Sequence, residues 1–301
     1  MTKKILFILL GLISHNFIKA QDLFDKKEVN LHSQWDINDT LADSEGLFKL
    51  KTYKPIYFLL ANYTNNVNTM PTSDSPDHSV TTPISLNDTE LKFQLSLKSK
   101  VLRNVFGKKI GGSVWMAYTQ TSRWQLYNGD LSRPFRETNY EPEIMLIVPT
   151  DYTIFGINGV YSGIGFNHQS NGRTNPISRS WNRIILQFGW ETKNLSIVLK
   201  PWFRIQEDAE IDDNPGIENY IGRAELMLAY KKGRHNISFI GRHSLRTGED
   251  NRGGMFVNYS YRVYNNLKLF TQFFHGYGES MIDYNHKQTT IGFGMSLLSW
   301  R

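Results

Sequence analysis

Apolar and polar residues alternate along much of the chain, and this period of two residues predicts β-strands. In LKFQLSLK (91–98) the leucines and the phenylalanine fall on one face, and the lysines, Gln94 and Ser96 fall on the other. AELMLAY (224–230) and TIGFGMSL (290–297) show the same alternation. In the last segment the second face carries Thr, Gly and Ser, which suits the narrow, filled interior of a barrel.

Turn-forming residues separate these segments and leave roughly ten to twelve strand candidates. The turn signals are Asn65-Asn66, Asn194, 212–215, 231–234, 250–254 and Asn265-Asn266. Residues 64–90 are rich in Thr, Ser, Asn, Asp and Pro, which indicates a long external loop of the kind outer-membrane barrels carry on one side. The pattern shows no sequence repeat and no linker, so we expect one domain over residues 21–301.

The first twenty residues, MTKKILFILLGLISHNFIKA, indicate a secretory signal peptide. Two lysines precede an apolar stretch over 5–13, and Ala20 precedes the expected cleavage site. The apolar stretch is too short to cross a bilayer as a helix. The alternative is a short N-terminal anchor helix. Residues 21–50 are mixed in character, and the pattern assigns them no element.

Composition narrows the class of protein further. The chain of 301 residues has no Cys, so disulfides cannot hold the exported protein. The formal charge of +6 falls to +3 without the signal, which contains three lysines and no acid, and this is too mild to indicate a nucleic-acid partner. Mean hydropathy is −0.41 and no apolar run approaches eighteen residues, which excludes a helical membrane protein and permits a transmembrane β-barrel.

These features together predict an all-β fold, a transmembrane antiparallel β-barrel. A soluble β-sandwich is the alternative, because its strands also alternate. The length of the strands, the tyrosine and tryptophan at their ends, and export all favour the barrel.

One polar stretch, FNHQSNGRTNPISRSWNR (166–183), lies between two such strands. In the strand that enters it, His168 and Ser170 share a face with Val160, Ile164 and Phe166. In the strand that leaves it, Asn182 shares a face with four apolar residues: Ile184, Leu186, Phe188 and Trp190. The polar side chains are therefore predicted on the apolar, outward face.

A hairpin centred near Asn175-Pro176 pairs residues whose numbers sum to about 350, which puts His168 beside Asn182 with Cβ atoms about 5 Å apart. Ser170 follows His168 by two residues on the same face, close enough for an Oγ–Nε2 contact. This arrangement predicts a Ser–His–Asn site, with Ser170 as nucleophile, His168 as general base and Asn182 orienting the imidazole. The alternative is three polar residues at a strand end, near lipid headgroups.

With these motifs the chain resembles the outer membrane phospholipase A family, which forms twelve-stranded barrels. The resemblance covers most of the chain from about residue 90 onwards, through YTQTSRWQLYN (118–128), PFRETNYEP (134–142), HQSNGRTNPISRSWNR (168–183), KPW (200–202), DDNP (212–215) and GYGESMIDYN (276–285). It implies a calcium-dependent outer-membrane enzyme that hydrolyses acyl esters of phospholipids and lysophospholipids at either glycerol position. It also implies a homodimer, dormant as a monomer because two half-sites complete the calcium site.

The family's triad falls on His168, Ser170 and Asn182, and its oxyanion-hole N–H, aided by a calcium-bound water, falls on Gly172. A glycine there allows close approach of the backbone to the intermediate. The resemblance puts calcium ligands at three positions of the dimer interface: the Arg173 carbonyl and Ser178 of one subunit, and Ser132 of the other. A second calcium position, used by the monomer, falls on Asp213. The alternative is that Asp212 and Asp213 are two acids in an ordinary turn and bind no metal.

Gln120 matches a polar residue of the family's dimer interface, and the alternative is a place at the strand end in the headgroup zone. The chain departs from the family in three places: a weak match over residues 21–90, a longer FRIQEDAEI stretch (203–211), and a last residue, Arg301, that follows the expected terminal aromatic Trp300.

Two other functions compete with a phospholipase. A porin or an adhesin needs no catalytic site, and a porin keeps its polar groups in the lumen, whereas the triad is predicted on the lipid side. An esterase for another lipid, such as a lipid A deacylase, is disfavoured by the motif match.

Overall fold

The structure is a computed structural model that describes residues 30–37, 46–154 and 156–298. The predicted signal peptide over 1–20, most of residues 21–45 and the three last residues lie outside these ranges. None of the helices within the ranges has the length and apolar character needed to cross a membrane.

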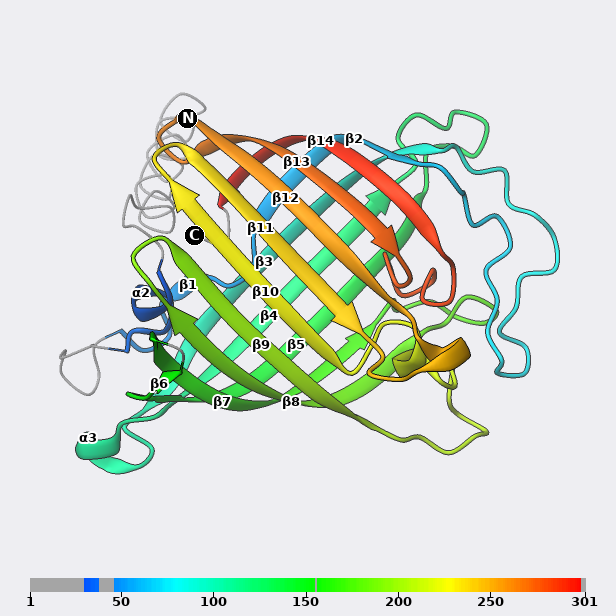
Figure 1. Cartoon of the computed structure of the whole chain (residues 1–301). Coiled ribbons are helices and arrows are strands. Elements are labelled where there is room, and N and C mark those ends of the chain that lie inside the picture. The colour runs from blue at the N-terminus through cyan, green and yellow to red at the C-terminus, as the bar shows by residue number, and fades with distance from the viewer. Residues whose placement is uncertain (1–29, 38–45, 155, 299–301) are drawn as a thin grey trace, which may run out of the picture.

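Within the described ranges, twelve antiparallel strands form a closed barrel in which each strand pairs with its neighbours in chain order and β14 closes onto β2 (Figure 1). The strands are β2 (Ile56–Thr64), β3 (Thr89–Arg103), β4 (Ser113–Trp124), β5 (Phe135–Pro149), β7 (Ile157–Ser170), β8 (Ser180–Glu191), β9 (Leu195–Ile205), β10 (Ala224–Lys232), β11 (His235–His243), β12 (Gly253–Tyr264), β13 (Leu267–Gly276) and β14 (Gln288–Leu298). The predicted transmembrane-type antiparallel β-barrel of twelve strands is confirmed, and the β-sandwich alternative is wrong.

The remaining elements are short. Strand β1 (Leu50–Thr52) adds to β3, and β6 (Thr153–Ile154) adds to β7. The helices are α2 (Leu31–Trp35) and α3 (Gly107–Ile110), and the 3₁₀ turns are η1 (Ile217–Asn219) and η2 (Gly248–Asp250).

The connections between strands are long at one end of the barrel and mostly short at the other. The long ones are 65–88, 125–134, 171–179, 206–223, 244–252 and 277–287. Each predicted turn signal lies between strands or overlaps a strand end: 231–232 close β10 and 253–254 open β12. Of the long loop predicted over 64–90, residues 65–88 lie outside the strands. This loop crosses the end of the barrel that carries the other long connections (Figure 1).

Alternation along the strands separates an apolar outside from a polar inside. On β14 the outward Phe293 is 54% exposed, while Ser296, three residues further on and on the opposite face, is buried. On β3 the outward Leu95 is exposed, and the inward Lys92 and Lys98 are each 1% exposed. A continuous belt of exposed apolar side chains is unfavourable in water and matches the lipid-facing surface of a membrane barrel.

One prediction of facing is wrong. Val160 was expected outward with Ile164 and Phe166, but it is buried in the interior cluster that contains Trp115 and Tyr161. The pairing of β7 with β8 shifts by one residue between Gly159 and Tyr161, and a shift of one residue moves a side chain to the other face. Beyond the shift, towards His168, the predicted parity holds.

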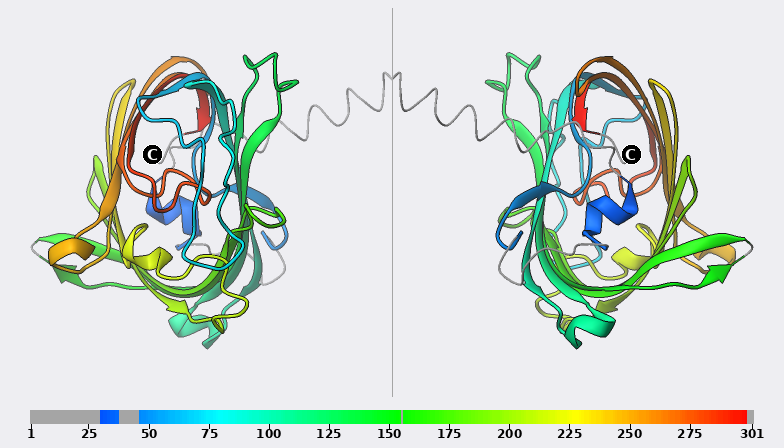
Figure 2. Two further views of the ribbon diagram at one scale, coloured as in Figure 1. Left: turned by 90° about the vertical axis from the view of Figure 1, so that its right-hand side faces the viewer. Right: turned by 90° about the vertical axis from the view of Figure 1, so that its left-hand side faces the viewer.

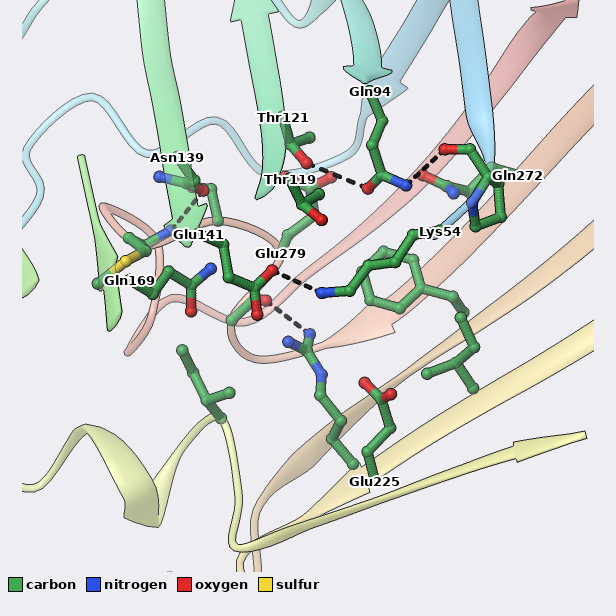
Figure 3. A pocket seen from close by; sticks show the side chains of 18 of the residues that line it. Lys54, Gln94, Thr119, Thr121, Asn139, Glu141, Gln169, Glu225, Gln272 and Glu279 are labelled. Carbon is green, nitrogen blue, oxygen red and sulfur yellow. Dashed lines mark hydrogen bonds and ion pairs between the residues drawn. The ribbon is translucent and has the colours of Figure 1, made fainter. Parts of the chain in front are cut away.

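Paired charges fill the barrel interior (Figure 3). Glu141 accepts from Lys54 at 2.6 Å and from Arg183 at 3.2 Å, and Glu279 pairs with both Lys92 and Arg123. Between these groups lies a cavity of about 160 Å³, room for a small cluster of waters. A porin keeps a wide aqueous channel, so the paired charges across the interior disfavour the porin interpretation.

Helix α2 lies inside the ring of strands when the barrel is seen from its ends (Figure 2). Its Trp35 packs edge-on against Trp115, with ring centroids 5.6 Å apart, and the ammonium of Lys98 lies 3.1 Å from the Trp35 centroid. The Asn30 side chain caps the helix by accepting from Ser33 N at 2.8 Å. An aromatic plug of this kind stabilises a buried lysine through its ring face.

Candidate active site

The hairpin of β7 and β8 holds His168 and Asn182 as a cross-strand pair. His168 Nδ1 and Asn182 Oδ1 are 2.8 Å apart, within hydrogen-bond range. Both side chains share the outward face with Ile164 and Phe166, which are 47% and 41% exposed. The predicted hairpin register, with residue numbers that sum to 350, is confirmed.

Ser170 is the last residue of β7 and pairs with Ser180. It lies two residues beyond His168 on the same strand, partly buried. Within the described ranges no hydrogen bond joins Ser170 Oγ to His168. Hydrogen bonds between a nucleophile and its base often tighten only when the substrate is bound, so the roles of these residues stay predictions.

Gly172 follows β7 in the turn 171–179 and has φ of +61°, a conformation that favours glycine. A Cβ at this position lies 3.1 Å from Cε2 of Tyr140, so a larger residue also meets a close contact. The Asn171 side chain fixes the turn, because its Oδ1 accepts from the backbone N–H of Arg173 and of Arg179 at 3.2 and 3.0 Å. The backbone at Gly172 is therefore held in one position.

Two of the four predicted calcium positions lie together. Ser178 Oγ donates to Asp213 Oδ2 at 2.7 Å, and Ser180 Oγ donates to the same oxygen at 3.3 Å. The other Asp213 oxygen lies 3.0 Å from Nε2 of His78. A hydroxyl that gives its proton to a carboxylate keeps its lone pairs for a cation, so Ser178 backed by Asp213 suits a hard, oxygen-preferring ion such as calcium.

The other two calcium positions, Arg173 and Ser132, make no hydrogen bond to Ser178 or Asp213 among the described residues. Arg173 is exposed, and its guanidinium donates to the Phe135 carbonyl at 2.6 Å. Ser132 lies in the loop 125–134, exposed, with φ of +58°. Among the described residues no group of three or more His, Cys, Asp or Glu side chains forms a metal cluster.

The long loop 65–88 folds onto the segment that carries Asp213. Ser73 Oγ donates to the Asp213 carbonyl at 2.7 Å, and the Arg179 guanidinium donates to the His78 carbonyl at 2.9 Å. Asp212 is buried and pairs with Arg204 at 2.6 Å. Asp212-Asp213 is therefore more than an exposed turn, because both acids bind side chains of neighbouring segments.

Gln120 lies outward on β4, after Met116 and Tyr118, as its parity predicts. It accepts from the Tyr118 hydroxyl and donates to Ser122 Oγ, both at 3.2 Å. Its amide is thus satisfied along its own strand.

Glu207 is a site residue that the sequence analysis missed. Its Oε1 accepts a hydrogen bond of 2.9 Å from Asn182 Nδ2. It lies in the FRIQEDAEI stretch, two residues beyond β9.

Comparison with known proteins gives consistent matches. The family described as Phospholipase A1 matches residues 31–297. The chain is 39% identical over 266 residues to a phospholipase A1 of Salmonella typhimurium, covering 87% of this chain and 86% of that one. It is 42% identical over 210 residues to a phospholipase A1 of Escherichia coli K12, covering 69% of each chain. A solved structure, the calcium-bound dimer of the Salmonella typhi outer membrane phospholipase, matches with a TM-score of 0.76 and 36% identity over 88% of this chain and 98% of that one.

Proposed function

Since the chain belongs to the phospholipase A1 family of outer-membrane barrels, we propose that it hydrolyses the acyl esters of phospholipids through Ser170, His168 and Asn182. The substrates include lysophospholipids, and cleavage occurs at both the A1 and A2 positions. Activity requires Ca²⁺ and a homodimer. The family resemblance drawn from the motifs is confirmed by the match over residues 31–297, and the adhesin alternative falls with it.

The observation that supports this proposal best is the 2.8 Å contact between His168 and Asn182 on the outward face of the barrel. A polar pair beside Phe166, at strand ends near the long loops, is costly against lipid unless it has a use. Phospholipid esters lie just below the headgroups, the depth that we assign to the pair because it lies near the ends of β7 and β8. The pair is thus where an ester can reach it without leaving the membrane.

The residues divide the reaction into two steps. Ser170 Oγ attacks the ester carbonyl carbon while its proton passes to Nε2 of His168, and the tetrahedral intermediate expels the lysophospholipid oxygen, which takes that proton. Water then attacks the acyl-enzyme, again losing a proton to His168, and the fatty acid leaves as Ser170 regains its proton. Asn182 accepts from Nδ1 of His168 throughout and keeps the ring aligned.

The negative oxygen of each intermediate faces the backbone N–H of Gly172. A backbone N–H in a fixed turn stabilises developing charge without reorganising. A side chain at position 172 would meet Tyr140 at 3.1 Å and would have to adopt a positive φ, so both the space and the backbone conformation favour glycine.

Calcium fits the oxygens of Ser178 and the Arg173 carbonyl, with Ser132 of a second copy and Asp213 behind Ser178. When bound, it supplies positive charge beside the intermediate. Ser132 is exposed in the loop 125–134, where a second copy could meet it, which is consistent with a ligand set completed by a partner. Gln120, on the outward face of β4, would then lie where the two barrels meet.

The proposal is tested with purified, refolded protein in mixed detergent micelles. Phospholipid, lysophospholipid and lipid A are offered separately, and the released acids are identified by mass spectrometry. We expect fatty acids from both phospholipid positions and none from lipid A, and Ser170→Ala removes hydrolysis while the barrel still folds. Release from lipid A alone supports the deacylase alternative, and activity retained by Ser170→Ala overturns the proposal.

A further inference from the structure

Glu207 reaches the site along the outward face of β9. Asn182 pairs with Ile205, the last residue of β9, and Glu207 follows two residues further on, in line with the exposed Phe203 and Ile205. A residue in this diagonal position lies within side-chain reach of its cross-strand neighbour. The 2.9 Å contact with Asn182 is therefore a consequence of the strand pairing.

The loop that follows Glu207 is anchored to the strands on both sides. The buried Arg204 of β9 pairs with Asp212 at 2.6 Å and with Glu218 at 3.1 Å. The backbone N–H of Ser180, at the start of β8, donates to Asn214 Oδ1 at 2.9 Å. These bonds fix the segment 206–223 against the hairpin, so Glu207 is held beside Asn182 rather than left in solvent.

A carboxylate only accepts hydrogen bonds, so Glu207 decides which end of the Asn182 amide faces it. With Nδ2 on Glu207, the amide oxygen faces Nδ1 of His168 at 2.8 Å. An oxygen there requires Nδ1 to carry the ring proton, which leaves the lone pair on Nε2. That nitrogen is the one a general base presents to a serine. A flipped amide presents a donor to Nδ1 instead and favours the opposite tautomer.

On the basis of the proposed function, we propose that Glu207 is a positioning residue that holds Asn182, and through it His168, in the orientation that ester hydrolysis requires. It also adds what a neutral asparagine lacks. The carboxylate lies one amide away from His168, and a charge-assisted hydrogen bond polarises that amide towards the imidazolium that forms during the reaction.

The surroundings of Glu207 supply a second readout, the pH dependence. Burial raises the pKa of Glu207 above its ordinary value, and the hydrogen bond from Asn182 opposes the shift. Among the charged groups that face it, Asp212 and Asp213 raise the pKa and Arg204 lowers it. Once protonated, the carboxyl group both donates and accepts, so it no longer selects one end of the amide. In the profile of activity against pH, the fall in activity on the acid side should therefore include the protonation of Glu207.

The experiment compares Glu207→Ala, Glu207→Gln and the matched loop control Glu210→Ala, an exposed acid three residues on. Each is made in the wild-type and in the Asn182→Ala background, and kcat and KM are measured on phospholipid micelles. We expect Glu207→Ala to lower kcat about fivefold with KM within about twofold. Glu207→Gln, which donates as well as accepts like the protonated acid, should lose less than Glu207→Ala and should remove the Glu207 titration from the acid side of the pH profile. In the Asn182→Ala background Glu207→Ala should change kcat by less than about 1.5-fold.

An unchanged kcat in Glu207→Ala, or an equal loss in both backgrounds, overturns the inference. The tautomer of His168 can be measured without any activity, so it tests the role of Glu207 separately from the proposed function. In ¹⁵N-histidine-labelled protein, the His168 signals, assigned by difference from His168→Gln, should show the Nδ1–H tautomer in wild type and a mixture in Glu207→Ala. If Ser170→Ala keeps activity, the proposed function fails, but the tautomer of His168 still tests whether Glu207 positions the ring. The same His168 tautomer in wild type and in Glu207→Ala refutes the positioning role of Glu207.

Discussion

Replacing Asn182 by alanine removes the only side chain that contacts Nδ1 of His168 in the described residues. At 2.8 Å the hydrogen bond is short, and during the reaction its donor is a charged imidazolium. A hydrogen bond to a charged group contributes about 1.5–3 kcal/mol. If the full amount is lost in the transition state, kcat falls about 10- to 150-fold. The site should nevertheless keep activity above that of Ser170→Ala, because nucleophile and base remain.

The assay is hydrolysis of a thioester phospholipid analogue in micelles, followed through the released thiol. Leu186→Ala is the matched control, since Leu186 lies on the same face of β8 and pairs with Ile164, four residues before His168. Folding is checked for each variant by the heat-dependent shift of the barrel on a gel. A loss of less than threefold in Asn182→Ala, or a loss as complete as in Ser170→Ala, refutes the assigned role of Asn182.

Four further changes have defined outcomes. Ser178→Ala should raise the Ca²⁺ concentration for half-maximal activity roughly tenfold, whereas the control Thr174→Ala in the same turn should leave it unchanged. Equal Ca²⁺ curves for wild type and Ser178→Ala would falsify Ser178 as a calcium ligand. Gly172→Val should abolish phospholipid hydrolysis while the barrel still folds. A measurable rate of hydrolysis in folded Gly172→Val contradicts this prediction. Glu279→Gln leaves Lys92 and Arg123 without their carboxylate and should lower the free energy of unfolding by about 3 kcal/mol in urea, against no change in the exposed Glu249→Gln. Burial alone would raise the pKa of Asp283, but the charge of Arg136 outweighs burial and holds this pKa well below its usual range. The ionised Asp283 therefore stabilises the folded protein above the unfolded pKa of about 3.9, and this stabilisation is lost as pH falls through the lowered value. The stability difference between wild type and Asp283→Asn should therefore be constant above about pH 5 and shrink in acid, and a constant difference down to pH 2 contradicts the reasoning.

The barrel and the hairpin could be predicted because both depend on local rules. Alternation separates lipid from lumen in β3 and β14, and the turn at Asn175-Pro176 fixes the pairing of His168 with Asn182. Val160 could not be placed, because a one-residue shift in pairing leaves no trace in the hydrophobic pattern. The interior ion pairs, such as Lys92 with Glu279, join segments nearly two hundred residues apart and follow only from the closed ring.

Glu207 was within reach of the same reasoning. The pairing of β8 with β9 joins residues whose numbers sum to 387, centred on the turn at Asn194 that the sequence predicts. Extending that register beyond Ile205 places Glu207 diagonally from Asn182. The contact of His78 with Asp213 could not be predicted in this way, because no periodicity fixes where the loop 65–88 folds.

The central claim is that Ser170 is the nucleophile of a site on the outward face of the barrel. A long-chain alkylsulfonyl fluoride, which transfers its sulfonyl group to an activated serine with loss of fluoride, tests it most directly. Mass spectrometry of the digested protein should find the label on Ser170 in wild type, and much less in His168→Gln or in excess chelator. Label on another serine, or equal labelling of Ser170 in His168→Gln, contradicts the account.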